Sequence, residues 1–472
     1  MSITGTDLRL HRERLGLSQA RLAELTGISQ HLLSAFELEK AELPLPLLET
    51  LHSALADKEK VASLVRREKR YRDHEYGEVE KRPERIAHAR RTNGNISYCQ
   101  LLGVLATRHK ANSPGAPTAL SLFSGCGGFS LGFSAAGFQV KGYLELEPGL
   151  RKIYGLNFPE SVEIGGDITK VTDERLRALR DEIGQIDVII GGPPCQGFSL
   201  SGKRKVDDPR NTLFKHYLRF VDSFRPRLAI LENVKLLTSM KNPAGGFVKD
   251  EICAEFQKHG YKISFFEINA KDYGVPQHRE RVIFVAVRND VPHAPSLPEA
   301  THGQIVDMFS AVSPFRTFGD ACSDLAFIES GEKSNDELHE AVRHPTHVIE
   351  WLWDVPEGCS AHDNEDEGKR PPSGYNTTYK RQLWNEPAST VQTTFGMISG
   401  CRNVHPIATR SLTVREAARI QSFPDSYRFI GSLGTIRTGI GNAVPPLLAY
   451  RLGMHARMLL DLVEVPGLQI EL

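Results

Sequence analysis

The stretch that decides the fold is Ala119-Leu120-Ser121-Leu122-Phe123-Ser124-Gly125-Cys126-Gly127-Gly128. Its first half is apolar and predicts a strand, and its second half is a glycine-rich turn that leads into a helix. Glycines in such a turn let backbone amides approach a ligand at the helix N-terminus. Tight packing of the strand against the helix explains the same glycines equally well. The stretch therefore predicts a strand–turn–helix unit and leaves its ligand open.

Downstream of this unit, apolar strands and amphipathic helices alternate along the chain. Helical patterns are expected at residues 173–183 and 212–224, and further strands are expected at residues 139–146, 186–190, 228–231, 262–269 and 281–287. Such alternation is typical of the α/β class, with a doubly wound, mostly parallel sheet. Ligands of these sheets bind at the carboxyl ends of the strands.

Acidic residues follow several of the predicted strands. Glu145 stands about twenty residues beyond the glycine-rich turn, a spacing that suits hydrogen bonds to ribose hydroxyls. Asp167 is placed to accept a hydrogen bond from an exocyclic amine, and Glu232 to be shared between two loops. Each also has a plain structural interpretation: a solvated strand end, an Asx-type turn and a carboxylate at a helix N-terminus, respectively. Together with the turn, Glu145 and Asp167 favour a nucleoside-bearing cofactor.

The segment Gly191-Gly192-Pro193-Pro194-Cys195-Gln196-Gly197-Phe198-Ser199 follows another predicted strand. Its two prolines fix φ and stiffen the approach to Cys195. A thiolate is the nucleophile that needs the least activation near neutral pH. An isolated loop cysteine is more often inert, so the segment alone does not decide its role. Further on, Arg279 and Arg281 share a face that suits an anionic or carbonyl-rich partner, or they form a surface ion-pair cluster.

Composition limits the kinds of ligand site and the cellular location that the sequence allows. The 472 residues carry a formal net charge of +0, so any nucleic-acid surface must be a local patch. The seven cysteines form no C-x-x-C pair, and we expect no metal site. No apolar run approaches the roughly 18–20 residues of a membrane span, and residues 1–7 lack the features of a signal peptide. We therefore expect a cytoplasmic protein that does not bind membranes.

Short helices are expected at the N-terminus. Ser18 and Ser29 are good N-caps for helices at residues 19–25 and 30–38, Gly27 breaks the chain between them, and a third helix is expected at residues 47–56. This pattern predicts an all-α helix-turn-helix domain at residues 1–56. Residues 57–116 are dominated by charged residues and end in a Pro- and Gly-containing stretch, so we expect a charged linker there.

Set in order, the chemistry-bearing segments resemble the cytosine-5 DNA methyltransferase family. The resemblance covers residues 118–460, and its most specific match is Pro193-Pro194-Cys195-Gln196-Gly197-Phe198-Ser199; the other matches are residues 123–128, 232–234, 277–281, 410–425 and 441–446. It implies a catalytic methyltransferase domain of the S-adenosylmethionine-dependent type at residues 117–290, a smaller irregular target-recognition domain at residues 291–405, and a C-terminal part, residues 406–472, that returns to the catalytic domain.

The resemblance implies a site for S-adenosylmethionine. Phe123 would stack on the adenine, Glu145 would hold the ribose, and Asp167 with Ile168 would contact the adenine edge. Leu146 would pack beside the adenine. The remaining expected cofactor contacts are Ser124, Gly125, Cys126, Gly127, Gly128 and Pro193, with Asn442 and Ala443 closing the pocket from the far end of the chain.

The resemblance also implies a DNA (cytosine-5-)-methyltransferase reaction. The Cys195 thiolate would add to carbon 6 of cytosine, and carbon 5 would then take the methyl group. Glu232 would hydrogen-bond ring nitrogen 3 and the exocyclic amine, Arg281 would contact the ring carbonyl, and Arg279 would support the site. The target cytosine must first leave the duplex. A loop after Cys195 would close on the flipped base, with DNA contacts from Gln196, Ser199, Ser201, Lys203 and Arg204.

Residues 16–29 separately resemble the repressor-type helix-turn-helix family. Gln30, His31 and Ser34 would then contact operator DNA, and the domain would regulate transcription of the enzyme's own gene. The near-neutral charge of this segment fits a dimerisation or packing domain as an alternative.

The leading hypothesis is a modification methylase that works beside a cognate restriction endonuclease. An RNA cytosine methyltransferase with the same motifs and a transcriptional regulator with a vestigial enzyme domain are the alternatives. The sizeable recognition region and the N-terminal domain favour DNA as substrate. The intact set of Cys195, Glu232, Arg279 and Arg281 argues against a vestigial enzyme.

Overall fold

The computed structural model describes residues 4–15, 17, 19–62, 79, 83–109, 115–194, 213–242, 245–305, 311–400 and 402–462. The chain divides into two compact units, Met1–Glu78 and Val79–Leu472. Within the described ranges, no helix has the length and apolar character that crossing a membrane requires.

The described part of the N-terminal unit is helical. It comprises α1 (Gly5–Arg14), α2 (Gln19–Thr26), α3 (Gln30–Glu37) and α4 (Leu45–Ala56), so the expected helices are confirmed to within two residues at each end. Gly27 has φ +72°, the left-handed conformation that favours glycine, and Ser29 caps α3 by accepting a hydrogen bond from the Leu32 amide. The predicted cap at Ser18 lies outside the described residues.

A buried ion pair joins the helices of this unit. The Arg12 guanidinium lies 2.7 Å from the Glu37 carboxylate, and the Gln19 side chain donates to the same carboxylate at 2.7 Å. Around it, apolar side chains of all the helices, such as Leu22 and Leu33, form one core. α1, α2 and α3 are therefore held together by polar as well as apolar contacts.

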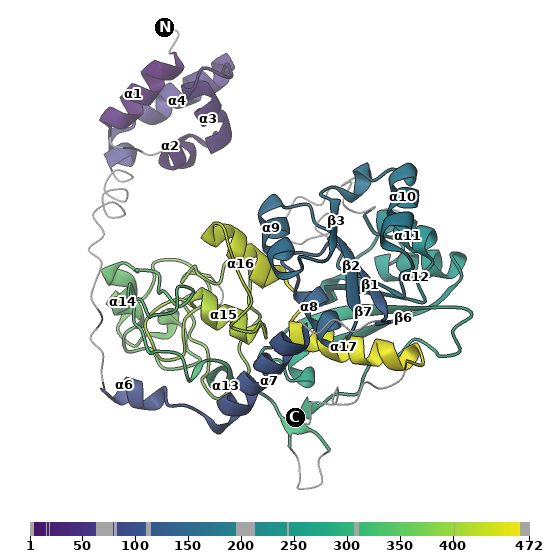
Figure 1. The fold of residues 1–472 in the computed structure, drawn as a ribbon. Coiled ribbons are helices and arrows are strands. Elements are labelled where there is room, and N and C mark those ends of the chain that lie inside the picture. Colours follow the sequence, from purple (N-terminus) through teal and green to yellow (C-terminus); the bar gives the residue numbers. More distant parts are fainter. Residues whose placement is uncertain are drawn as a thin grey trace. The chain divides into compact units, whose positions relative to one another are not determined.

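The described residues of the second unit contain a seven-stranded sheet in the order β3-β2-β1-β4-β5-β7-β6 (Figure 1). Neighbours from β3 to β5 are parallel, whereas β7 is antiparallel to β5 and β6. The doubly wound, mostly parallel sheet is thus confirmed. The strands are β1 (Thr118–Leu122), β2 (Gln139–Leu144), β3 (Val162–Gly165), β4 (Val188–Gly191), β5 (Leu228–Val234), β6 (Tyr261–Asn269) and β7 (Glu280–Arg288).

Helices cover both faces of this sheet (Figure 1). One core includes residues of α7 (Asn93–His109), α8 (Gly128–Ala135), α9 (Pro148–Asn157) and α17 (Pro446–Leu459), and the other includes residues of α10 (Asp173–Ile183), α11 (Leu213–Phe224) and α12 (Val248–Lys258). Alternate strand residues enter opposite cores: in β5, Leu228 and Ile230 belong to the first, and Ala229 and Leu231 to the second. Burial on both faces explains why the strands are continuous apolar runs.

The linker predicted at residues 57–116 is wrong for its second half. α6 (Pro83–His88) and the 17-residue α7 lie in this range, and both belong to the second unit. Tyr98, Leu101, Leu102 and Leu105 recur at helical spacing and are buried in the same core as α8 and α17. The charged residues at 66–72 and 81–85 dominated the interpretation of the whole range, so this amphipathic pattern was not recognised.

The described part of residues 291–405 contains few regular elements, and the role of this region in target recognition stays a prediction. The regular elements described there are β8 (His302–Gly303), β9 (Ser313–Pro314), α13 (Phe318–Cys322), α14 (Thr346–Leu352), η6 (Ala361–Asp363) and η7 (Glu367–Lys369). The chain then returns to the sheet through α15 (Val414–Ile420) and α16 (Leu433–Asn442). Phe318, Trp384 and Phe395 share the first core, so this region is anchored to one face of the seven-stranded sheet.

Candidate active site

Several predicted site residues that the structure describes lie at or next to the carboxyl ends of neighbouring strands. β2, β1, β4 and β5 are parallel neighbours, so their carboxyl ends lie side by side. Phe123, Glu145 and Gly192 directly follow β1, β2 and β4, and Glu232 is near the end of β5. This edge is where doubly wound sheets bind their ligands.

The glycine-rich turn after β1 is tightly wound and open on one side. Phe123, Gly125 and Gly127 have φ values of +54°, +56° and +95°. A Cβ at Gly127 would lie 2.5 Å from the Tyr427 hydroxyl, whereas a Cβ at Gly125 would meet nothing within 4 Å. Glycine is required at 127 by packing. At Gly125 the space beside the backbone remains free for a ligand.

Glu145 is held in place by backbone amides. Its carboxylate accepts hydrogen bonds from Gly125 N at 2.8 Å and Glu147 N at 2.9 Å, and the residue is buried. Burial raises the pKa of Glu145 above its ordinary value, although both amide hydrogen bonds act in the opposite direction. A buried carboxylate with unused lone pairs, next to the open side of Gly125, suits the hydroxyls of a ribose.

Three residues predicted to contact the adenine differ in their surroundings. Leu146 is 67% exposed directly after Glu145, and Ile168 is buried in the second core. Asp167 accepts hydrogen bonds from the Thr169 amide at 3.0 Å and the Thr169 hydroxyl at 2.7 Å, which lower its pKa. Both hydrogen bonds are accepted by Oδ1 of Asp167, as expected of an Asx-type turn residue. Its contact with an adenine stays a prediction.

Ser124 and Cys126 are structural parts of the turn. The Ser124 hydroxyl donates to the Ser121 carbonyl at 2.9 Å, which fastens the turn to β1. Cys126 is 1% exposed, and burial raises the pKa of its thiol to about 12. A thiol with that pKa is not a nucleophile near neutral pH.

The loop before Cys195 is fastened to β5. A Cβ at Gly191 would lie 2.6 Å from the Leu122 carbonyl oxygen, so the strand end is closely packed. Asn233 donates from Nδ2 to the Pro193 carbonyl at 2.8 Å. This contact holds Pro193, two residues before Cys195, beside the end of β5. No role was predicted for Asn233, although its place directly after Glu232 was a usable signal.

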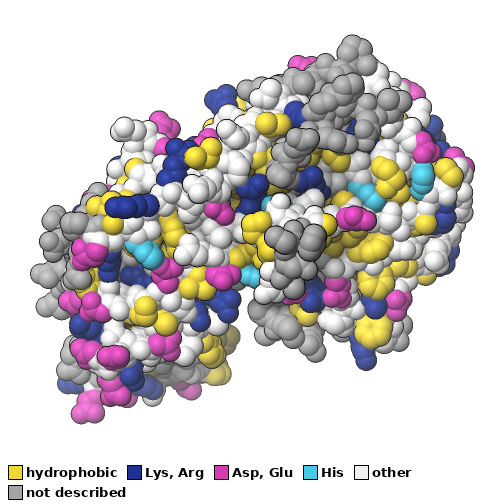
Figure 2. Space-filling view, turned by 90° about the horizontal axis from the view of Figure 1, so that it is seen from below, with side chains coloured by type: hydrophobic (Ala, Val, Ile, Leu, Met, Phe, Trp, Pro, Cys, Tyr) yellow, Lys and Arg dark blue, Asp and Glu magenta, His cyan; other side chains and the backbone are white. Residues whose placement is uncertain are grey.

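Cys195 lies outside the described residues, as do Gln196, Ser199, Ser201, Lys203 and Arg204. Their assignments stay predictions. On the face shown in Figure 2, Lys and Arg side chains are interspersed with Asp and Glu, and neither sign dominates. That mixture agrees with the formal net charge of +0 and leaves DNA contacts to local groups.

Glu232 and Arg281 form a shielded ion pair at the site. Arg281 Nε lies 2.7 Å from Glu232 Oε1, and the two side chains are only 13% and 11% exposed. A Cβ at Gly192 would lie 3.3 Å from Glu232 Oε2, so the second carboxylate oxygen faces the loop that leads to Cys195. The antiparallel pairing of β5 with β7 brings the two residues together.

Arg279 has no hydrogen bond to this pair among the described residues, and its role in supporting the site stays a prediction. It is 1% exposed and donates to the carbonyls of Val391 at 3.3 Å, Gly441 at 3.0 Å and Ala443 at 2.9 Å. Burial lowers its pKa well below the ordinary value. Arg279 therefore ties β7 to the segment after α16.

The segment after α16, residues 443–446, packs against the glycine-rich turn. A Cβ at Gly128 would lie 2.4 Å from the Val444 carbonyl oxygen and 3.1 Å from the Ala443 Cβ. Asn442, the last residue of α16, is exposed. Ala443 therefore lies beside the turn, whereas cofactor contacts of Asn442 and Ala443 stay predictions.

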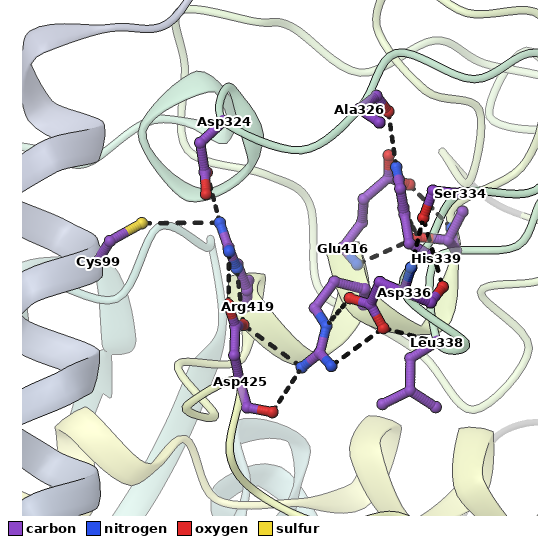
Figure 3. A network of polar contacts seen from close by, with 12 residues as sticks. Cys99, Asp324, Ala326, Ser334, Asp336, Leu338, His339, Glu416, Arg419 and Asp425 are labelled. Atoms are coloured by element: carbon purple, nitrogen blue, oxygen red, sulfur yellow. Dashed lines mark hydrogen bonds and ion pairs between the residues drawn. The ribbon is translucent and has the colours of Figure 1, made fainter.

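The motif at residues 410–425 is a charged scaffold (Figure 3). Arg419 is paired with Asp425 at 2.6 Å and Asp324 at 2.5 Å, and Arg415 with Asp336 at 2.5 Å. These pairs join α15 to the chain around α13. Another residue of the motif, Phe423, lies against the glycine-rich turn, because a Cβ at Gly128 would be 3.2 Å from its Cζ atom.

The predicted operator contacts lie at the start of α3 in the N-terminal unit. Gln30 and His31 are exposed, and Ser34 is half-buried on the same helix. This placement leaves Gln30 and His31 accessible to a ligand. Binding of DNA by this unit stays a prediction.

The sheet order and the strand-end site define the second unit as an S-adenosylmethionine-dependent methyltransferase by fold. A solved structure described as a DNA modification methyltransferase encoded within an Escherichia coli prophage matches it with a TM-score of 0.57 and 26% identity, covering 73% of this chain and 100% of that chain.

Residues 118–456 match the family model of the C-5 cytosine-specific DNA methylases. The chain belongs to this family and is a DNA (cytosine-5-)-methyltransferase. It is 38% identical over 337 residues to the type II methyltransferase M1.HphI of Haemophilus parahaemolyticus, covering 70% of this chain and 84% of the relative. It is 36% identical over 374 residues to the type II methyltransferase M.DdeI of Desulfomicrobium norvegicum, covering 71% and 86%. Members of the family use S-adenosylmethionine as methyl donor.

Proposed function

We propose that this enzyme methylates carbon 5 of a cytosine that is flipped out of a specific duplex DNA site, with Cys195 as nucleophile. The observation that carries the proposal is the shielded Glu232–Arg281 pair, 2.7 Å apart, beside the loop that leads to Cys195. A carboxylate and a guanidinium side by side match the amine, ring nitrogen and carbonyl along one edge of cytosine.

The reaction begins with attack by sulfur. The Cys195 thiolate forms a bond to carbon 6, and the electrons of the 5,6 double bond make carbon 5 nucleophilic. S-adenosylmethionine, when bound, supplies the methyl group. A water molecule then takes the proton from carbon 5, and the electrons of that carbon–hydrogen bond restore the 5,6 double bond as the thiolate leaves. Two steps with modest barriers thereby replace one difficult step.

Glu232 and Arg281 act on the ring while charge develops. Glu232 accepts a hydrogen bond from the exocyclic amine and a second one from ring nitrogen 3 once that nitrogen has taken up a proton, and Arg281 donates to the ring carbonyl oxygen. Both groups lie in a site largely shielded from water, where such contacts stabilise a transition state more than they would in solution. In the free enzyme the two charges compensate each other, and the cytosine edge lies along both groups, which are already in place side by side.

The residues around the glycine-rich turn fit S-adenosylmethionine. Free space lies beside Gly125, and the buried Glu145 carboxylate next to it has capacity for ribose hydroxyls. Phe123 and the exposed Leu146 provide apolar surface for the adenine, with Asp167 at its edge. These residues bind and orient the cofactor.

The comparisons also support a place in a restriction–modification system, because the relatives include type II methyltransferases. We infer that a cognate restriction endonuclease is the functional partner and that residues 291–405 read the target sequence. A direct test incubates the full chain and tritium-labelled S-adenosylmethionine with duplex DNA or tRNA. Label in DNA supports the proposal, and label in tRNA alone contradicts it. Bisulfite sequencing of the methylated DNA then gives the target site.

Replacing Glu145 with glutamine tests the cofactor site. Loss of the carboxylate charge weakens hydrogen bonds from the ribose hydroxyls, and hydrogen bonds to charged groups contribute roughly 1.5–3 kcal/mol. We expect the Kd for S-adenosylmethionine to rise about 10-fold to 100-fold in titration calorimetry. Glu147→Gln, at the exposed neighbouring carboxylate, is the control and should leave the Kd unchanged.

The same site predicts a pH dependence. Burial raises the pKa of Glu145 in the free enzyme above its ordinary value of 4.5, whereas donated ribose hydroxyls stabilise the charged form and lower the pKa in the complex. Cofactor affinity should therefore fall as the pH drops through the free-enzyme pKa. Glu145→Gln should lack this fall. An affinity independent of pH in the unchanged enzyme, with Glu147→Gln behaving identically, would argue against a ribose contact at Glu145.

For the N-terminal unit we propose binding of operator DNA through α3, which would let the enzyme regulate its own gene. Its support is the turn between α2 and α3 and the accessible Gln30 and His31. We expect Gln30→Ala combined with His31→Ala to weaken binding to DNA upstream of the gene at least about tenfold, since side chains that read base edges contribute about 1–3 kcal/mol each. Gel-shift titration measures this, and Glu49→Ala, exposed on α4, is the control. Unchanged DNA binding by the double variant would refute the assignment of Gln30 and His31 as DNA contacts.

A further inference from the structure

Residues 83–109, the strap, lie before the part of the chain that the family model matches. α6 and α7 of the strap run from beside α14 to α17 in Figure 1. From its first to its last residue, the strap contacts the recognition region (residues 291–405), then the charged scaffold at α15, and then the helices that cover the catalytic sheet.

The first end of the strap is fastened to the recognition region. Arg85 donates to the Trp353 carbonyl and to the Thr409 hydroxyl at 3.0 Å, and its guanidinium lies 4.1 Å from the centroid of the Trp353 ring. Arg85 is also 3.6 Å from Glu329 Oε1, a buried oxygen that accepts no hydrogen bond from the described residues. At the exposed rim of this contact, His88 Nε2 lies 2.5 Å from Glu357 Oε1. Arg85 is thus the central side chain of this end.

The middle of the strap contacts α13 and α15. Asn95 donates to Asp324 at 2.7 Å, the same carboxylate that pairs with Arg419 (Figure 3). The buried Tyr98 hydroxyl donates to the Arg419 carbonyl at 2.6 Å, and Cys99 Sγ lies 3.6 Å from the Arg419 guanidinium. The strap is therefore part of the network that holds α15.

The last turn of α7 reaches the helices that cover the catalytic sheet. Arg108 donates to the Tyr450 hydroxyl of α17 at 3.0 Å, and His109 lies 2.9 Å from the Asn157 carbonyl of α9. Leu101 and Leu105 are buried against the same core. One continuous segment thus spans from the recognition region to the catalytic sheet.

We infer that the strap is a positioning element, which holds the recognition region at the orientation to the catalytic sheet that DNA binding requires. The inference rests on the proposed role of residues 291–405 in reading DNA. None of the described strap residues reaches the ends of β1, β4 or β5, where the chemistry takes place. Loosening the strap should therefore weaken DNA binding and leave the chemical step intact.

Arg85→Ala in the full chain tests this inference. We expect the KM for DNA to rise about tenfold, because a half-buried guanidinium with several partners is lost. We expect kcat and the Kd for S-adenosylmethionine to stay within about twofold of the unchanged enzyme. Arg85→Lys keeps the cation near Glu329 and should recover part of the DNA affinity. Glu84→Ala, exposed on the same helix, is the matched control and should have no effect.

Hydrogen exchange without DNA gives a second readout. Amides of residues 405–411 should exchange faster in Arg85→Ala than in the unchanged chain, while amides of β1, β4 and β5 should not. An unchanged KM for DNA with unchanged exchange overturns the inference, as does a parallel loss of kcat and cofactor affinity. If the unchanged enzyme fails to methylate DNA, the proposed function fails, and exchange still decides whether the strap positions the recognition region. His88→Ala, a rim variant with little risk to folding, should show the same changes at smaller size.

Discussion

Cys195→Ala is expected to lower kcat for DNA methylation by at least about 10⁴-fold, the scale seen when a nucleophile is removed from a covalent mechanism. Without sulfur addition to carbon 6, carbon 5 of cytosine stays a poor nucleophile. The cofactor residues around Phe123 and Glu145 are untouched, so the Kd for S-adenosylmethionine should remain the same. Tritium transfer to duplex DNA measures the first quantity, and titration calorimetry the second.

Cys253 provides a control that separates the loss of the nucleophile from the loss of any cysteine. Cys253 lies on α12 and is half-buried, and burial raises the pKa of its thiol. Cys253→Ala should retain full activity. Equal transfer by the Cys195→Ala and the unchanged enzyme would refute the nucleophile assignment.

Glu232→Gln is expected to lower kcat by about 10²-fold to 10³-fold, the range found when one stabilising group is removed from an anion-binding active site. Glutamine keeps the size of the side chain and loses its charge. It also leaves Arg281 without its charge partner in a shielded site, which is unfavourable. Because Glu232 acts on the ring as charge develops, kcat should fall much more than the affinity for DNA.

The control for Glu232 is a carboxylate on the neighbouring strand. Glu280 begins β7, pairs with Lys235 at 2.8 Å and has a side chain that is 58% exposed. Glu280→Gln should keep activity within about twofold, since exposed ion pairs contribute little. Comparable losses in both variants would show that the effect of Glu232→Gln is not specific to the site.

Much of the fold could be predicted from local patterns. The strands of the parallel sheet are buried on both faces, so each is a short apolar run that ends at a turn, as at Thr118–Leu122. The helix at Asp173–Ile183 was predicted with its observed bounds because its apolar stripe is a local signal, and the structure adds an N-cap at Thr172. The strand-end positions of Glu145 and Glu232 followed from the same reasoning.

Features that depend on distant contacts could not be predicted in the same way. α16 contains Gly434, Gly439 and Gly441, which weaken the helical pattern; a Cβ at Gly441 would lie 2.5 Å from the Thr393 amide nitrogen. Arg279 and Arg281 are two residues apart, yet one binds backbone carbonyls in the interior and the other binds Glu232. Their spacing predicted one shared face toward an anionic or carbonyl-rich partner, and in the structure the two side chains have different partners. Only the packing of the segment after α16 decides which arginine takes which partner.

The most direct test of Cys195 as nucleophile uses duplex DNA with 5-fluorocytosine at the mapped target position. Fluorine cannot leave carbon 5 as a cation, so the bond between sulfur and carbon 6 should persist after methyl transfer. We expect a covalent protein–DNA complex that forms only with S-adenosylmethionine present, and peptide mass spectrometry should place the nucleotide on Cys195. Failure to form the complex, or a nucleotide attached to another cysteine, would contradict the assignment.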